Sequence, residues 1–432
     1  MNRRRFTVGG LIVLALVGLL IAFAARPVAQ AQTDQTATFT VESSSYESHY
    51  PRGLTFTIQA TSTGGDITRA TLFYYLRTGL RNRANAEFDA ATGMWTTSPY
   101  ADGGGLPPWV DFQYNWLLTD AAGNTFETES QYAIYADNTR DWWNIDTPYI
   151  TLYWFGTMPD LGDAVAQAME TMAPVFTEGW GRLISYKPLA VLFPDGESWN
   201  EYVSGGVNPN AAGFTEPSEG YTVQRIDALR SQASLNELRS RCGGFWIGPE
   251  PTTPEEYRLW TTVHTIVHET THLYQSDFNV LRGPAWWTEG DPNFFASQDG
   301  HLVTNADARM RAYAANGYPL VSLQGEGPTG GATLAADGCR ALHYAAGESF
   351  INFVVQNYGG LETHAKIVAN LAGKTVQEDF AEITGVPFID LENQWRTAMG
   401  FPIIQALPTP TPFALPTVPP FTIPTPPGSG GG

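Results

Sequence analysis

Apolar and polar residues alternate with a period of two from Ala37 to about Asn138. The runs 54–60 and 112–118 are examples in which every second side chain is apolar. Because successive strand residues point to opposite faces, this pattern predicts strands with one face on a core and the other in water. Turn-forming stretches such as 120–124 separate the runs. Several short strands without helical periodicity between them predict an antiparallel β-sandwich of immunoglobulin or fibronectin type over residues 36–138.

The pattern changes after Arg140. Tyr149 to Phe155, Leu189 to Phe193 and Tyr221 to Ile226 are short apolar or alternating runs that predict strands. Leu161 to Ala173 carries its apolar residues on one helical stripe, and a long helical segment extends from about Glu255 to Gln275. Mostly helical sequence continues to Trp395. Strands followed by helices predict an α+β domain over residues 139–400, in which a small sheet packs on a helical half.

The two ends of the chain differ from the rest. Arg3 to Arg5, the apolar stretch 11–25 and the small residues Ala29 and Ala31 form the pattern of a signal peptide over residues 1–31, which predicts export from the cytoplasm. The apolar stretch is nearly long enough to span a bilayer, so a retained membrane anchor is the alternative. The Pro/Thr/Gly-rich residues 401–432 cannot build a helix or central strand, so we expect an extended, disordered tail.

Composition narrows the classes of partner. The 432 residues exceed the usual size of one domain, and 43% hydrophobic residues supply ample material for buried cores. Acidic residues number 43 against 24 basic ones, which gives a net charge of −19. A surface with this excess of negative charge repels phosphate backbones, which argues against nucleic acid as a partner.

Cys242 and Cys339 are the two cysteines of the chain. In an oxidising compartment two cysteines in one domain predict a disulfide, with two separate buried thiols as the alternative. The bond would close a long loop and stabilise the fold by up to ~4 kcal/mol.

The most specific motif is His268-Glu269-Thr270-Thr271-His272. Residues four apart lie one above the other on a helix, so both imidazoles can bind one metal while Glu269 reaches a water on it. A catalytic zinc also needs a third ligand, and Glu289 can supply it from a second helix that begins near Pro284. The alternatives are an ordinary hydrogen-bonded histidine pair and a shifted ligand register that uses His264. No Glu follows His264, so we expect it in the core or behind the ligands.

Together with Trp286-Trp287-Thr288-Glu289-Gly290, this motif resembles the gluzincin metallopeptidases and, more narrowly, the bacterial peptidase MA-like proteins. Residues 135–154 are similar to the junction between sandwich and protease domain in that family, and 344–360 and 386–400 to its helical C-terminal part. The resemblance implies one zinc ion on His268, His272 and Glu289, with Glu269 as the general base.

Two further points concern the site. Tyr344, which matches the family's tyrosine, is expected to donate to the oxyanion, with His343 as its rival and simple packing of the ring as the alternative. Pro292 departs from the pattern because it lies where the helix bearing Glu289 would continue. We expect either a kink there or a restarted helix capped by Asp291.

The function expected from these features is zinc-dependent hydrolysis of peptide bonds in peptides or proteins outside the cytoplasm. A non-catalytic zinc-binding surface or scaffold protein is one alternative, and an amidase acting on cell-wall peptide is another. Nothing in the predicted sandwich suggests catalysis. We expect it to act as a spacer, in substrate presentation or attachment, or as a plain structural module.

Overall fold

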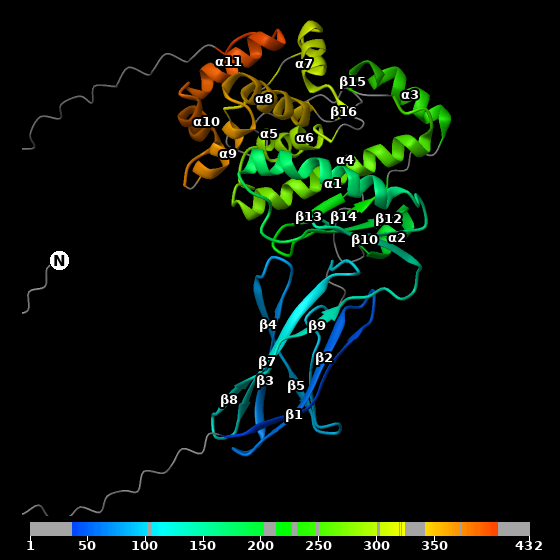
Figure 1. Ribbon diagram of the computed structural model, residues 1–432, viewed down its shortest axis with the longest axis vertical. Helices are drawn as coiled ribbons and strands as arrows, with labels where there is room; N and C mark the ends of the chain where they lie inside the picture. Colours follow the sequence, from blue (N-terminus) through cyan, green and yellow to red (C-terminus); the bar gives the residue numbers. More distant parts are fainter. Residues whose placement is uncertain are drawn as a thin grey trace, which may run out of the picture.

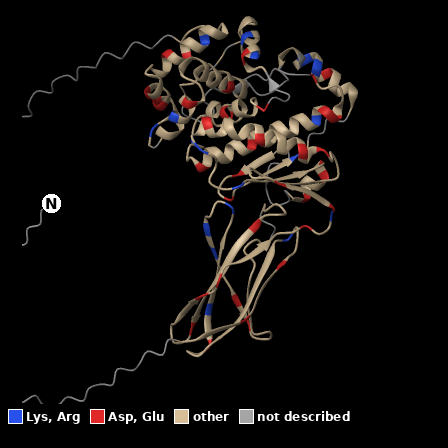
Figure 2. Cartoon of the chain, viewed as in Figure 1, with Lys and Arg blue, Asp and Glu red and all other residues tan. Residues whose placement is uncertain are grey.

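The computed structural model describes residues 37–101, 105–202, 213–226, 231–247, 250–299, 303–318, 320, 322–324, 342–371 and 373–404. Two β-sheets form one end of the elongated molecule, helices form the other, and a further sheet lies between them (Figure 1). Acidic residues occur on both the strands and the helices (Figure 2). No helix in the described ranges combines the length and apolarity needed to cross a bilayer.

Within the described residues of the N-terminal half, nine antiparallel strands form two sheets. The strands are β1 (Phe39–Ser48), β2 (Leu54–Ser62), β3 (Ile67–Tyr75), β4 (Arg81–Asn85), β5 (Glu87–Asp89), β6 (Met94–Thr97), β7 (Asp111–Asp120), β8 (Thr125–Glu127) and β9 (Gln131–Ile134). The first sheet has the order β1-β2-β6-β5, and the second has the order β4-β3-β7-β8 with β9 also on β7. The predicted antiparallel strands are therefore present, whereas the immunoglobulin or fibronectin class stays a prediction.

The alternating pattern places one face of each sheet in a shared core. Phe56 of β2 is fully buried, and its ring lies 4.9 Å from that of Tyr114 and 6.2 Å from that of Phe112, both on β7 of the other sheet. Residues on the opposite face of β2, such as Thr55 and Thr57, are partly exposed. The period of two thus decides which side chains enter the core.

A five-stranded mixed sheet follows. It contains β10 (Trp142–Asp146), β11 (Thr151–Phe155), β12 (Leu189–Phe193), β13 (Gly213–Glu216) and β14 (Tyr221–Arg225), in the order β10-β11-β12-β14-β13. The three central strands are parallel, and both edge strands are antiparallel to their neighbours. All residues of β12 are buried, as expected for a central strand that is covered on both faces.

Different layers cover the two faces of this sheet. Leu152 and Leu192 belong to the core that includes helices α1 (Leu161–Trp180) and α4 (Pro254–Asp277). Val191 on the other face belongs instead to the core of the two N-terminal sheets, together with helix α2 (Gly196–Tyr202). The predicted packing of a sheet on helices is therefore present, but the second face is shared with the N-terminal part.

Direct contacts fix this junction. The Trp109 ring stacks on the Tyr153 ring with centroids 4.8 Å apart, and the Tyr202 hydroxyl donates to the carbonyl of Gly105 at 2.5 Å. Since one apolar core extends across the junction, the N-terminal sheets and the mixed sheet hold a defined relative position. The predicted domain boundary near residue 138 stays a prediction.

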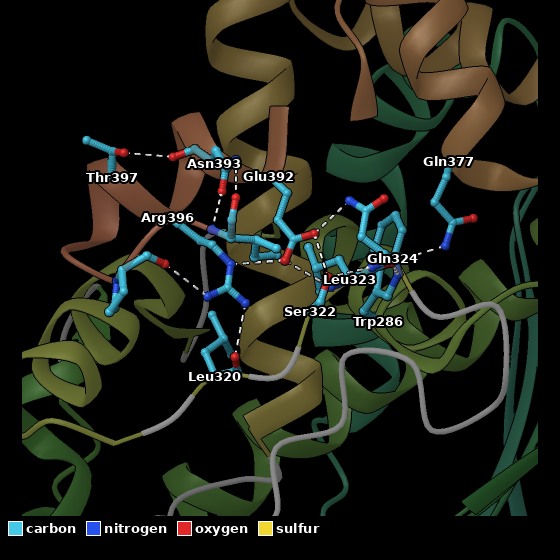
Figure 3. A network of polar contacts seen from close by, with 12 residues as sticks. Trp286, Leu320, Ser322, Leu323, Gln324, Gln377, Glu392, Asn393, Arg396 and Thr397 are labelled. Atoms are coloured by element: carbon cyan, nitrogen blue, oxygen red, sulfur yellow. Dashed lines mark hydrogen bonds and ion pairs between the residues drawn. The ribbon is translucent and has the colours of Figure 1, made fainter. Parts of the chain in front are cut away.

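Helices make up most of the rest. They are α3 (Gln232–Cys242), α5 (Ala285–Thr288), α6 (Gly290–Ala296), α7 (Ala306–Ala315), α8 (Leu342–Tyr358), α9 (Leu361–Asn370), α10 (Val376–Thr384) and α11 (Phe388–Met399), with a small pair of strands, β15 (Trp246–Ile247) and β16 (Val303–Thr304). A buried polar network joins α11 to α5 (Figure 3). In it, Glu392 pairs with Arg396 at 3.0 Å and accepts from the Leu323 amide, whose carbonyl accepts from the Trp286 indole.

Several predicted features lie outside the described residues, namely the signal segment 1–31, Cys339 and the tail from residue 405. Cys242 is buried at the end of α3 and is not a free thiol. Its predicted bond to Cys339 stays a prediction. The first residues of the predicted tail pack against α11, since Phe401 is buried beside Trp395.

Candidate metal centre

Helix α4 supplies the two histidines. Thr253 caps its N-terminus by accepting from the Glu256 amide at 3.1 Å, and Pro254 occupies the first turn, where a missing N–H costs nothing. Buried residues such as Val267 hold one side of the helix in the core. The rings of His268 and His272 consequently project together from successive turns, with centroids 4.9 Å apart.

Glu289 lies at the junction of α5 and α6, with a φ of −106° and a ψ of −32°. Helix α6 already begins at Gly290, so Pro292 falls in its first turn, where backbone N–H groups have no acceptor within the helix. The expected kink at Pro292 is therefore replaced by a break at Glu289. The helix does restart, as the second alternative expected, but Glu289 precedes its first residue and Asp291 lies inside α6 with its side chain fully buried.

A close helix crossing sets the position of this junction. A Cβ atom on Gly290 would lie 2.4 Å from the Cα of Gly347 in α8, and one on Gly347 would lie 1.9 Å from the carbonyl oxygen of Trp286. Only glycine at both positions lets α6 and α8 approach this closely. Sequence reasoning missed both residues, because an isolated glycine within a helix does not reveal its partner.

The three predicted ligands meet at one point. Glu289 Oε2 lies 3.5 Å from His268 Nε2 and 3.7 Å from His272 Nε2, and the ligand atoms of the three residues all lie within 4.8 Å of one another. Zinc bonds of about 2.1 Å in a tetrahedron place neighbouring ligand atoms roughly 3.4 Å apart. The spacing and the two-nitrogen, one-carboxylate donor set therefore fit a zinc ion.

Electrostatics also favour a cation here. Burial alone would raise the pKa of Glu289, but the hydrogen bonds and charges of His268 and His272 hold it well below its usual range. Burial likewise opposes charge on His272, but Glu289 and Glu269 outweigh this effect and raise its pKa to about 9. The carboxylates thus create a negative potential at the histidine nitrogens, as a metal ion requires.

The outer nitrogen of each histidine has a hydrogen-bond partner. His268 Nδ1 lies 2.9 Å from Asn293 Oδ1, and His272 Nδ1 lies 2.9 Å from Gln275 Oε1. Since both partners are oxygen acceptors, each Nδ1 donates to its partner, and Nε2 is the nitrogen that each ring would offer to a metal. Sequence reasoning missed Asn293 and Gln275. Their spacing, four residues after Glu289 and three after His272, is the signal that could have found them.

A chain of buried groups continues from His272. Gln275 Nε2 donates to Asp291 Oδ2 at 3.1 Å, Asp291 Oδ1 lies 2.8 Å from His364 Nε2, and His364 Nδ1 lies 2.6 Å from the carbonyl oxygen of Gly179. This chain ties α4 and α6 to α9 and the end of α1. His364 was not a predicted site residue. His264 is buried outside the ligand cluster.

The remaining predicted residues lie on the same cavity. Glu269 Oε2 accepts from the Thr215 hydroxyl of β13 at 2.6 Å, and the Tyr344 ring lies 6.0 Å from the His268 ring. The side chain of His343 lies outside the described part of the chain. The cavity has a volume of about 300 Å³ and is lined by Gly213, Phe214, Thr215, Pro217, His268, Glu269, His272, Leu281, Glu289 and Tyr344.

Comparison with known proteins adds distant likenesses. No protein-family model matches the chain, and no curated protein does. Among solved structures, it is similar to aminopeptidase A of Legionella pneumophila in complex with aspartic acid, at 11% identity and a TM-score of 0.35, over 71% of this chain and 31% of that one.

It is also similar to an aminopeptidase N family protein from Idiomarina loihiensis, at 10% identity and a TM-score of 0.31, over 82% of this chain and 71% of that one. A carbohydrate-binding module of family 56, a β-1,3-glucan binding domain, matches 22% of the chain over 98% of its own length, at 11% identity and a TM-score of 0.17. At TM-scores this low, the interpretation of the site rests on its own geometry.

Proposed function

We propose that this chain is a zinc-dependent metallopeptidase of gluzincin type that hydrolyses peptide bonds of peptide or protein substrates outside the cytoplasm. The observation that carries the proposal is the convergence of His268 Nε2, His272 Nε2 and a Glu289 oxygen within 4.8 Å, with Glu269 beside them on one cavity. A zinc ion held there would polarise the scissile carbonyl and acidify a water molecule.

The residues of the chain supply the remaining functions. Glu269 would take the proton of the attacking water and pass it to the leaving amine. The Thr215 hydroxyl, which donates to Glu269 Oε2 at 2.6 Å, would hold this carboxylate in position. Asn293 and Gln275 would keep the two imidazoles in the tautomer that presents Nε2 to zinc. Tyr344 would donate its hydroxyl to the oxyanion.

We also propose that the N-terminal sheets form a sandwich of the immunoglobulin or fibronectin class. Its support is the strand order. The first, second, sixth and fifth strands share one sheet, as A, B, E and D do in that class. The third, seventh and eighth share the other, as C, F and G do, with the fourth added at its edge. Export is a further part of the proposal, and its support is the signal-peptide pattern of residues 1–31.

The test compares wild type with Glu269→Gln, and with Glu255→Gln as a matched control at the solvent-exposed start of the same helix. Wild type and both variants should bind about one zinc per chain, measured by elemental analysis. Hydrolysis of a peptide library should fall at least about a hundredfold in Glu269→Gln and stay unchanged in Glu255→Gln, because only the first substitution removes proton transfer.

Other outcomes identify other functions. Absence of bound zinc after zinc-supplemented expression would refute the metal site. Stoichiometric zinc without turnover in wild type would favour a non-catalytic zinc-binding scaffold. Cleavage of cell-wall peptides but not of ordinary peptides would favour an amidase. Full activity of Glu269→Gln would show that another group is the base.

A further inference from the structure

A second cavity lies next to the candidate metal centre, where the N-terminal sheets meet the rest of the chain. Its volume is about 420 Å³. Four segments of the chain line it. They are Thr78 to Leu80 between β3 and β4, the single residue Tyr186, Pro217 with Ser218, and Ser276 with Asp277 at the end of α4. Pro217 also lines the cavity that contains the metal ligands.

The two cavities are consecutive along α4. His268 and His272 line the first, whereas Ser276 and Asp277 line the second. At a helical rise of 1.5 Å per residue, the second pair lies about 10 Å along the axis from the midpoint of the two histidines. An extended peptide advances about 3.3 Å per residue, so it would reach the second cavity roughly three residues from the cleaved bond.

The wall contributed by the N-terminal sheets is fixed in place. The Thr78 hydroxyl donates to the carbonyl of Ser218 at 2.6 Å. The preceding residue, Arg77, pairs with Asp111 at 2.6 Å and donates to the carbonyl of Lys187 at 3.1 Å. These contacts anchor the β3–β4 loop on both sides of the junction, so Leu80 presents a 52% exposed apolar side chain from a held backbone.

The chemistry of the cavity favours an uncharged ligand. Its one lining carboxylate, Asp277, is already bound by Arg182 at 2.6 Å and by the Ser185 amide at 3.1 Å. The hydroxyl oxygen of Tyr186 is buried and has no hydrogen-bond partner among the described residues. Because that oxygen is closed to solvent, Tyr186 contributes the apolar surface of its ring to the wall of the cavity.

We propose that the second cavity is a substrate subsite built jointly by the N-terminal sheets and the peptidase part. It takes an apolar side chain of an extended polypeptide, about three residues from the cleaved bond, against Leu80 and the ring of Tyr186. The inference rests on the proposed peptidase function and specifies its substrate class as polypeptides longer than a few residues. It also gives the N-terminal sheets a part in substrate recognition.

The experiment uses the full chain and two fluorogenic peptides derived from a cleavage site mapped in a denatured protein. One has about ten residues, and the other is cut to about two residues on each side of the cleaved bond. The variant is Leu80→Ser. The matched control is Phe88→Ser, which removes a 53% exposed apolar side chain from strand β5 of the same N-terminal part.

For Leu80→Ser, KM for the long peptide should rise about tenfold, as expected for losing the burial of one leucine side chain, with kcat little changed. KM for the short peptide should change by less than about twofold. Phe88→Ser should alter neither. The inactive variant Glu269→Gln allows the same comparison by fluorescence anisotropy, where Leu80→Ser should weaken binding of the long peptide by the same factor.

A second variant tests the nature of the contact. Leu80→Asp should shift the preferred substrate residue at this position from apolar to Lys or Arg, measured by profiling a peptide library. If wild type cleaves peptides but Leu80→Ser affects long and short peptides equally, or neither, the subsite is refuted and the peptidase function stands. If wild type cleaves no peptide at all, the proposed function fails and the subsite fails with it.

Discussion

Replacing Asp291 with alanine tests the buried chain behind the metal ligands. The Asp291 carboxylate accepts from Gln275 at 3.1 Å and lies 2.8 Å from His364 Nε2, and all three side chains are at most 1% exposed. Alanine would leave Gln275 Nε2 and His364 Nε2 without this acceptor in a site that water does not reach. Because Gln275 also holds His272, the loss should extend to the metal centre.

The magnitude follows from the contacts that are lost. Each hydrogen bond to a charged group contributes about 1.5–3 kcal/mol, so the two bonds of Asp291 together contribute about 3–6 kcal/mol. Removing one partner of a buried pair costs about 3–5 kcal/mol, which agrees with that range. Loss of the direct hydrogen-bond partner of a metal-bound histidine typically weakens metal affinity about 10–100-fold. Asp291 acts one bond further away, through Gln275, so we expect the lower end of that range, about tenfold, for zinc.

Two assays separate the effects. Urea unfolding of chelator-treated protein, followed by far-UV circular dichroism, measures the free energy of unfolding without a contribution from zinc. Competition with a chromophoric chelator measures zinc affinity. Asp390→Ala, at an exposed position on α11, is the control and should change neither quantity.

A double-mutant cycle that combines Asp291→Ala with His364→Phe tests whether the two residues act through one contact. Phenylalanine keeps the ring that stacks on Trp287 at 5.7 Å but removes the nitrogen that faces Asp291. If the two residues act through one contact, their effects on unfolding should be non-additive by about 0.5–3 kcal/mol. Additive effects, or unchanged zinc affinity in Asp291→Ala, would show that the chain does not support the metal centre.

Two further predictions concern single groups. Tyr344→Phe should lower kcat about a hundredfold at unchanged zinc content, since it removes one oxyanion donor. His343→Ala should lower kcat much less. The reverse order of the two variants in steady-state kinetics would make His343 the donor. Burial raises the pKa of Asp379 to about 6, so between about pH 4 and pH 6 the folded state binds more protons than the unfolded state. The free energy of unfolding should therefore fall as pH rises through this window in wild type and change less in Asp379→Asn. If urea titrations give both proteins the same dependence of this free energy on pH, the raised pKa of Asp379 is contradicted.

Features that depend on local spacing could be predicted from the amino-acid sequence. The period of two identified the antiparallel strands of the N-terminal half, because a strand places alternate side chains on one face. The four-residue spacing of His268 and His272 placed both rings on one side of a helix. The distinctive stretch around Glu289 located the third member of the cluster, and all three side chains meet in the structure.

The residues behind and beside this cluster became apparent from the three-dimensional packing. His364 reaches Asp291 across 73 residues and Gly179 across 185, and the loop bearing Leu80 reaches the end of α4 from the N-terminal sheets. The helix break lies at Glu289 and not at Pro292, where the sequence predicted it, and Gly290 and Gly347 let α6 and α8 touch beside it. The two kinds of feature differ in how far along the chain the interactions behind them extend. Backbone periodicity acts over a few residues and is written in the local pattern, whereas a buried hydrogen bond or a shared cavity wall forms only once packing brings distant segments together.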